Sequence, residues 1–148
     1  MNLANIIKFI TKKKYIIYPV NNTIDAGGIA SEPYIILDDT VSFLELAKTV
    51  LNALKESKLD VKRPDDWKEF RKQYLKSMQV RTMKELHKDS ISLGVLKRDG
   101  VIRFSPTKNM GSRKGFQYSK SLSPVELLEN SSIEEIAKAL EEALLRCE

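Results

Sequence analysis

The stretch SISLGVLKRDGVIRFS, residues 90–105, gives the strongest structural prediction in the chain. Ile91, Leu93 and Val95 alternate with smaller or charged residues, which is the period of a strand with one buried face. The dipeptide Asp99-Gly100 follows, and it favours the type I′ turn of a two-residue hairpin. The pattern therefore predicts an antiparallel hairpin with strands over residues 90–98 and 101–105.

Towards the C-terminus, residues 106–115 form a glycine-containing basic stretch that is typical of a mobile loop between strands. Further strands are expected over residues 116–120 and near residues 125–128. Ser131 and Glu134 have the spacing of a capping box, which predicts that the last helix begins there. The residues of that helix expected to face the core are Ile133, Ile136, Ala137, Leu140 and Leu144.

Towards the N-terminus, the apolar residues of the first ten have helical spacing, so a short helix is expected there, followed by a strand over residues 15–20. Residues 21–33 contain Gly27-Gly28 and end in proline, which predicts a long loop. A short strand over residues 34–37 should precede a helix that Asp38, Asp39 and Thr40 cap and that ends near residue 57. The apolar stripe of that helix is Phe43, Leu44, Ala47, Val50, Leu51 and Leu54.

A second, strongly charged helix is expected to begin near Pro64, with Asp65 and Asp66 at its positive end. Trp67, Phe70 and Tyr74 keep helical spacing along it. Such an aromatic stripe could stack on bases, but packing against the core or another helix is the commoner role.

These elements predict an α+β fold in a single domain over residues 1–148, with a central, mostly antiparallel sheet flanked by about three to four α-helices. The length suits one domain, and 42% apolar with 30% charged residues is the balance of a folded chain. Exposed sheet edges leave a monomer and a homodimer both open.

The sequence offers little material for a catalytic, metal or cofactor site. It has one histidine, His87, which lies among charged residues and is expected to be solvated, and one cysteine, Cys147, near the C-terminus. Neither glycine cluster has the frame of a nucleotide-binding loop, and each pair of acidic residues suits a helix start or a polar helix face. We therefore expect a protein that is not an enzyme and binds no metal or cofactor.

The apolar run near the N-terminus is too short for a membrane helix and has its lysines on the wrong side for a secretory signal. With the lone cysteine, this favours a cytoplasmic protein without a membrane partner. The net charge of +5 leaves open a small basic nucleic-acid-binding protein, whose surface would include Lys12, Lys13 and Lys14, Lys68, Arg71, Lys72 and Lys76 on the charged helix, and the basic loop.

Several segments, in their order along the chain, resemble the CdiI-type immunity proteins of bacterial contact-dependent growth inhibition. They are the helix after a short strand, Trp67-Lys68-x-Phe70, the Asp99-Gly100 hairpin, Ser105-Pro106-Thr107, Gly115-Phe116 and the terminal helix at residues 133–147.

The resemblance implies a protein that binds and neutralises the cognate toxin C-terminal domain, typically a nuclease, in a stoichiometric complex. It also implies that a toxin β-hairpin could add to an open sheet edge, where backbone groups supply affinity and loops supply specificity. The candidate partner-binding residues are Lys108, Asn109, Arg113, Lys114, Phe116, Gln117, Tyr118 and Lys120. Because the protein is basic, it does not mimic nucleic acid, and an exosite or an acidic toxin surface is the expected target.

Overall fold

The predicted hairpin lies at the centre of the sheet. In the computed structural model, which describes residues 1–148, β5 (Ser90–Arg98) and β6 (Val101–Asn109) pair antiparallel. Asp99 and Gly100 have φ angles of 52° and 78°, as a type I′ turn requires. The hairpin is confirmed, but β6 continues to Asn109, so the first part of the predicted basic loop is strand.

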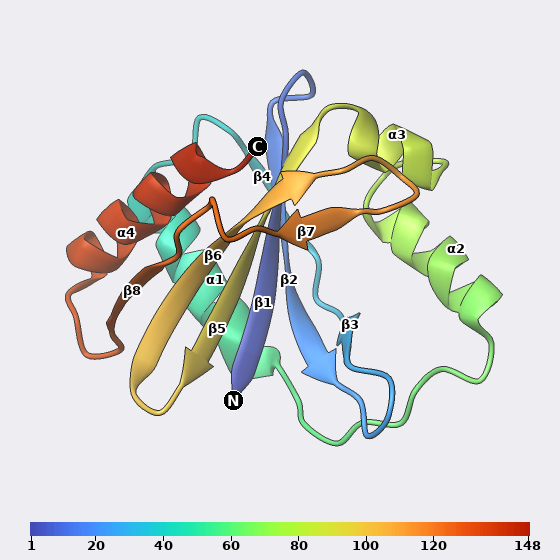
Figure 1. Ribbon diagram of the computed structural model, residues 1–148, viewed down its shortest axis with the longest axis horizontal. Helices are drawn as coiled ribbons and strands as arrows, with labels where there is room; N and C mark the ends of the chain where they lie inside the picture. The colour runs from blue at the N-terminus through green and yellow to red at the C-terminus, as the bar shows by residue number, and fades with distance from the viewer.

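Eight strands form one sheet, and every pair of neighbouring strands is antiparallel (Figure 1). The order across the sheet is β3-β2-β1-β5-β6-β7, with β4 paired to β2 and β8 paired to β6. The other strands are β1 (Asn2–Phe9), β2 (Lys14–Asn22), β3 (Gly28–Ala30), β4 (Ile35–Asp38), β7 (Phe116–Tyr118) and β8 (Val125–Leu128).

The predicted helix over the first ten residues is wrong, because this segment is strand β1. Ile6 and Ile7 are both buried, but they belong to cores on opposite faces of the sheet. A central strand covered on both faces carries a nearly continuous apolar run, and such a run matches helical spacing as readily as strand spacing.

Four helices accompany the sheet, so the α+β architecture is confirmed. They are α1 (Phe43–Glu56), α2 (Trp67–Ser77), α3 (Met83–Lys88) and α4 (Ile133–Arg146). Helix α1 is capped by Ser42, whose hydroxyl accepts the N–H of Glu45, and α4 by Ser132, whose hydroxyl accepts the N–H of Glu135. Each cap satisfies a backbone donor that the first helical turn leaves without a partner.

The predicted helix starts are each displaced along the chain. Asp38 ends β4, and its carboxylate accepts hydrogen bonds from the N–H and hydroxyl of Thr40, which lower the pKa of that carboxyl. Ser131 precedes the true cap of α4, and Pro64 lies before α2, whose cap is Asp66. In all three cases several capping residues stand together in the sequence, and the packing of the helix selects one of them.

The larger core lies between the sheet and the helices α1 and α4 (Figure 1). Strand residues such as Ile17 and Phe104 meet helix residues such as Leu54 and Leu140 there, and all four are almost fully buried. The predicted stripes of both helices are confirmed as core-facing. Truncating a residue such as Leu140 to alanine should cost about 2–5 kcal/mol.

A smaller core covers part of the opposite face, where α2, α3 and their connection lie over β1 and β2. Its buried side chains are Ile7, Phe9, Ile16, Tyr18, Met78, Val80 and Leu86. Helix α2 contributes no fully buried residue of its own. The covering of this face is therefore thin.

Two predictions for connecting segments are wrong. His87 is not solvated: it belongs to α3 and only 7% of its surface is exposed. The long loop over residues 21–33 contains β3, which pairs with β2. Both short elements are held by tertiary contacts, which a local sequence pattern does not reveal.

None of the four helices has both the length and the apolar character needed to cross a membrane.

Candidate functional site

A groove lies on the face of the sheet opposite α1 and α4. Its larger part has a volume of about 850 Å³ and a floor formed by β1, β5 and β6. Residues 118–124 form one wall, and Val20 and Gly28 stand on the other side. Asn5, Gly94 and Ser105 belong to the floor, and these small or polar side chains leave the face hollow.

The smaller part of the groove has a volume of about 400 Å³ and adjoins the first part, because Asn5, Val20 and Gly28 line both. Its walls are more apolar and include Tyr18, Ile29, Trp67, Phe70 and Tyr74. The groove therefore runs from the connection after β7 to helix α2.

Gly94 allows Tyr118 to close over the floor of the groove. A Cβ atom at Gly94 would overlap the Tyr118 hydroxyl, so the tyrosine approaches the sheet at the one floor position without a side chain. Tyr118 remains 69% exposed, while burial of its hydroxyl end raises the pKa of that phenol. The side chain is thus both a wall of the groove and an accessible surface.

The connection between β6 and β7 is fixed by Asn109. Its amide nitrogen donates to the carbonyl oxygens of His87 at 2.7 Å and Ser90 at 2.9 Å, and its Oδ1 accepts the N–H of Gly111 at 3.0 Å. The His87 ring lies against Phe116, with ring centroids 4.6 Å apart, and its Nδ1 is 2.8 Å from the carbonyl oxygen of Met83. The loop is therefore tied to α3.

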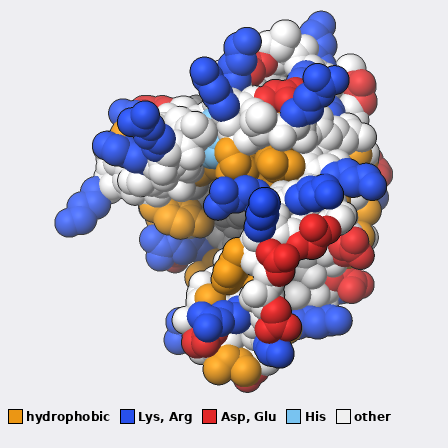
Figure 2. All heavy atoms as spheres, turned by 90° about the vertical axis from the view of Figure 1, so that its right-hand side faces the viewer, with side chains coloured by type: hydrophobic (Ala, Val, Ile, Leu, Met, Phe, Trp, Pro, Cys, Tyr) orange, Lys and Arg blue, Asp and Glu red, His pale blue; other side chains and the backbone are white.

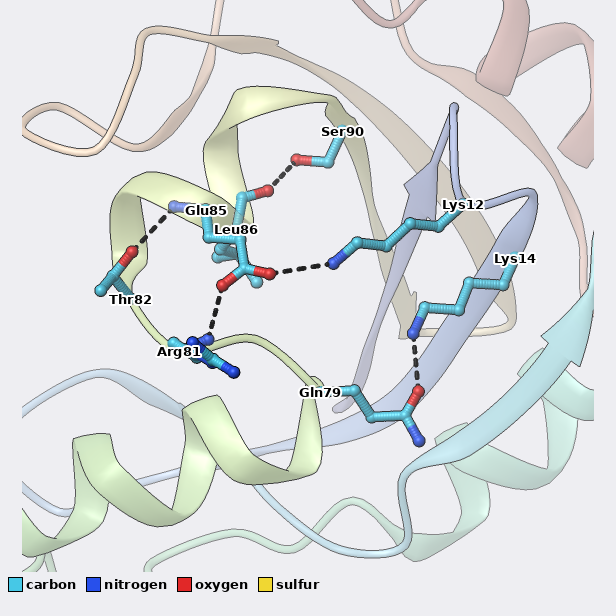
Figure 3. Close-up of polar contacts among 8 residues, drawn as sticks. All are labelled: Lys12, Lys14, Gln79, Arg81, Thr82, Glu85, Leu86 and Ser90. Carbon is cyan, nitrogen blue, oxygen red and sulfur yellow. Dashed lines mark hydrogen bonds and ion pairs between the residues drawn. The ribbon is translucent and has the colours of Figure 1, made fainter.

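Helix α3 is in turn tied to the turn between β1 and β2 (Figure 3). Lys12 Nζ lies 3.3 Å from Glu85 Oε1, and Lys14 Nζ donates to Gln79 Oε1 at 2.6 Å. Glu85 also accepts the backbone N–H of Arg81 at 2.8 Å, and this bond, followed by Lys12, lowers the pKa of the carboxyl. These contacts hold the α2–α3 wall against the sheet.

The aromatic side chains at α2 pack edge to face against one another. Tyr74 meets Tyr18 at 81°, with their hydroxyl oxygens 3.2 Å apart, and Tyr34 packs against both. Trp67 and Phe70 meet at 79°. Burial raises the pKa values of Tyr18, Tyr34 and Tyr74, so all three phenols stay protonated at neutral pH.

Positive charge is concentrated in two segments that form the walls of the groove. Residues 67–88 and 105–124, called here the basic segments, together carry eleven Lys or Arg and two Glu, whereas the rest of the chain carries fourteen Lys or Arg and eighteen Asp or Glu. On the side of the molecule that includes α2 and α3, lysine and arginine side chains gather around exposed hydrophobic ones (Figure 2). The molecule is therefore strongly polarised.

The predicted partner-binding residues lie together on the β6–β7 connection, but they do not all reach the groove. Tyr118 and Lys120 line it. Lys108, Arg113, Lys114 and Gln117 are exposed on the same basic segment, while Asn109 and Phe116 are held by the contacts with His87. The floor residues and α2 were not predicted as part of the site, although the small residues that alternate with Ile91, Leu93 and Val95 carried a signal for a hollow face.

No group of three His, Cys, Asp or Glu side chains comes together in a way that could hold a metal ion. The thiol of Cys147 donates to the carbonyl oxygen of Ser92 at 3.3 Å, and burial raises its pKa. The groove thus offers apolar contacts, hydrogen bonds and positive charge, which is the chemistry of a binding surface.

Comparisons with solved structures show the same fold. A protein of unknown function, NMB0488 from Neisseria meningitidis, matches with a TM-score of 0.80 and 22% identity, over 99% of this chain and 95% of its own. A toxin and immunity complex, CdiA-CT/CdiI from Yersinia pseudotuberculosis, matches with a TM-score of 0.77 and 19% identity, over 99% and 97% respectively. No curated protein matches the chain.

The family model of the CDI immunity protein, CdiI, matches residues 9–147. This range includes all four helices and every strand except β1, of which it includes only Phe9. The earlier resemblance is therefore confirmed, and the chain belongs to the CdiI family of CDI immunity proteins.

Proposed function

We propose that this protein neutralises a cognate toxin C-terminal domain by forming a stoichiometric complex with it inside the cell that makes both. The observation that carries the proposal is the family match over residues 9–147. The groove supports it, because it combines apolar walls with accessible charge, as protein interfaces do. In this role the protein binds its partner without turning over a substrate.

Co-purification with the product of the adjacent upstream gene tests the proposal. Calorimetry at physiological salt should show one-to-one binding with a Kd of about 1 nM or tighter, near −12 kcal/mol. Cells that express the toxin domain should survive when this protein is also expressed. Absence of binding together with continued cell death would contradict the proposal.

We further propose that the toxin is a nuclease and that this protein inhibits it without mimicking nucleic acid, by binding an exosite of the toxin or an acidic toxin surface. A mimic of nucleic acid would need an acidic surface, whereas the walls of this groove are basic. The purified toxin domain should degrade RNA or DNA, and an equimolar amount of this protein should stop the degradation. A toxin domain without nuclease activity would remove this part of the proposal.

Strand addition at β7 is the proposed mode of contact. Strand β7 is the last strand on its side of the sheet, so its outer edge has backbone groups available for pairing. The amide hydrogens of residues 116–118 should exchange more slowly in the complex than in the free protein. Unchanged exchange there would exclude strand addition at this edge while leaving the binding itself intact.

Nucleic-acid binding is the second candidate, and the basic segments are the observation that favours it. It predicts binding to single-stranded RNA that weakens steeply as salt rises. A flat salt response or no binding would exclude it.

A further inference from the structure

The two basic segments face each other across the groove. Residues 105–124 contain Lys108, Arg113, Lys114 and Lys120 without any acidic residue, and they form the wall beside β6. Residues 67–88 contribute Trp67, Phe70 and Tyr74 to the other end. A ligand that fills the groove therefore meets the charged side chain of Lys120 at one end and apolar, mainly aromatic side chains at the other.

None of these positive charges at the β6 wall is neutralised within the protein. Lys108, Arg113, Lys114 and Lys120 take part in no ion pair, and no Asp or Glu lines either part of the groove. Arg103, the other charged residue of the lining, lies 3.4 Å from Glu126 with both side chains about half exposed. The field inside the groove is therefore positive and attracts an anionic group.

The shape of the aromatic end favours a peptide over bases as that anionic ligand. Trp67 and Phe70 pack edge to face, as do Tyr18 and Tyr74, so the rings hold one another in place. The hollow beside these rings is mainly apolar, and Ala26, Ile29 and Ala30 line it together with them. Apolar side chains fit such a hollow, whereas a nucleotide there would place its phosphate beside no lysine or arginine of the lining.

We propose that the groove receives an acidic segment of the toxin whose apolar or aromatic side chains enter the hollow at α2. Acidic side chains of the segment approach Lys114 and Lys120, while the apolar anchor packs against Trp67 and Phe70. This inference rests on the proposed function, since it names the part of the toxin that the site recognises. The basic segments speed association and the apolar hollow slows dissociation.

Charge reversal with a matched control tests the first part of the proposal, that lysine side chains attract acidic side chains of the toxin. The double variant Lys114→Glu and Lys120→Glu reverses the charge of one residue that lines the groove, Lys120, and of one exposed residue of the same basic segment, Lys114. The control Lys55→Glu and Lys138→Glu makes the same change in net charge on exposed positions of α1 and α4. Stopped-flow measurements against the cognate toxin domain should show association about tenfold slower for the groove variant, with a flatter salt dependence. Equal association rates for the two double variants would overturn this electrostatic part of the proposal.

Two further substitutions test occupancy of the groove. Trp67→Ala should weaken binding by about tenfold or more, chiefly through faster dissociation, whereas Leu145→Ala, which truncates an exposed residue of α4, should leave it unchanged. Ser105→Trp should fill the floor and block binding, while circular dichroism shows an intact fold. Normal binding by a folded Ser105→Trp variant would overturn the proposal.

Overlapping peptides that cover the toxin sequence identify the segment directly. The acidic, apolar-rich peptides should compete with the whole toxin for the wild-type protein and fail to bind the Ser105→Trp variant. If the wild-type protein binds the toxin but every groove variant binds equally well, the proposed function stands and this inference fails. If single-stranded RNA competes with the toxin and is lost in the same variants, the ligand is nucleic acid and the inference is overturned.

Discussion

At the scale of single residues, Gly94 sets the position of the groove wall, because only hydrogen at this position leaves room for the Tyr118 hydroxyl. Substitution Gly94→Ala should push Tyr118 away from the sheet at a cost of at most about 1–3 kcal/mol, since the ring is mostly exposed and can move. The pKa of the Tyr118 phenol, raised by burial, should fall towards its ordinary value. Nuclear magnetic resonance titration of ring-labelled tyrosine measures this shift.

Tyr118→Phe provides the matched background for measuring the cost of Gly94→Ala, since it removes the hydroxyl oxygen that a Cβ at Gly94 would meet most closely. Adding Gly94→Ala to Tyr118→Phe should therefore change the free energy of unfolding less than adding it to the wild type. Equal effects in the two backgrounds would show that this contact does not set the position of Tyr118.

Asn109 has a structural role within the candidate surface, because its side chain makes three hydrogen bonds to backbone groups. Asn109→Ala leaves the carbonyl oxygens of His87 and Ser90 without this donor and should lower the free energy of unfolding by about 1–3 kcal/mol. Urea unfolding measures the loss. Asn109→Asp keeps the acceptor for Gly111 but not the donor, so recovery of full stability by aspartate would contradict this account.

At the scale of secondary-structure elements, the caps of α1 and α4 decide where each helix begins. Ser132→Ala should lower the free energy of unfolding by about 1 kcal/mol, because the Glu135 N–H loses its acceptor. Ser131→Ala, one residue earlier, should have almost no effect, since that side chain makes no capping bond. Thermal unfolding of the two variants checks the helix start, and equal losses would contradict it.

The attachment of α2 through the tyrosine cluster predicts a loss of stability in alkali. Burial raises the folded-state pKa values of Tyr18, Tyr34 and Tyr74, so above pH about 10 the unfolded chain binds fewer protons than the folded one. The free energy of unfolding should then fall as pH rises, by at most about 1.4 kcal/mol per pH unit for each tyrosine. Below pH about 9 the cluster should contribute no pH dependence.

Tyr34→Phe isolates one of these tyrosines, because the Tyr34 hydroxyl makes no hydrogen bond within the protein. The variant should unfold with nearly the same free energy as the wild type at pH 7 and with a smaller slope between pH 10 and 11, by the linkage between protonation and stability. Urea unfolding across this range measures both quantities. An unchanged slope would show that Tyr34 does not contribute to the alkaline loss.

Sequence patterns predicted the elements whose packing has one buried side. Strand β8, the first half of β6 and the stripes of α1 and α4 alternate between more buried and more exposed residues, so their period is visible. Strand β5 is mostly buried, but its apolar residues alternate with small and polar ones, which also makes a strand period visible. Strand β1 is buried on both faces and its period is hidden, which is why a helix was expected. Helix α3 is too short to show a period and is held by contacts with distant residues such as Lys12.

At the scale of the whole molecule, the candidate surface was predicted in part. The residues of the β6–β7 connection are basic and glycine-rich, and these properties are local. The groove depends on which half of the sheet α2 and α3 cover, and that is set by tertiary packing. From their spacing alone, Trp67 and Phe70 were therefore expected to pack in the core or against another helix. In the structure they line the groove, and Trp67 is partly exposed.

The two faces of the sheet also differ in what a mutation would cost the organism. Stability resides mainly in the core beneath α1 and α4, while the groove occupies the opposite face. Substitutions on the groove side can therefore change the partner without unfolding the scaffold. When a bacterial strain meets a new toxin, single substitutions in the groove can change which toxin its immunity protein binds. Sequence differences between competing strains can then accumulate in the groove with little loss of stability.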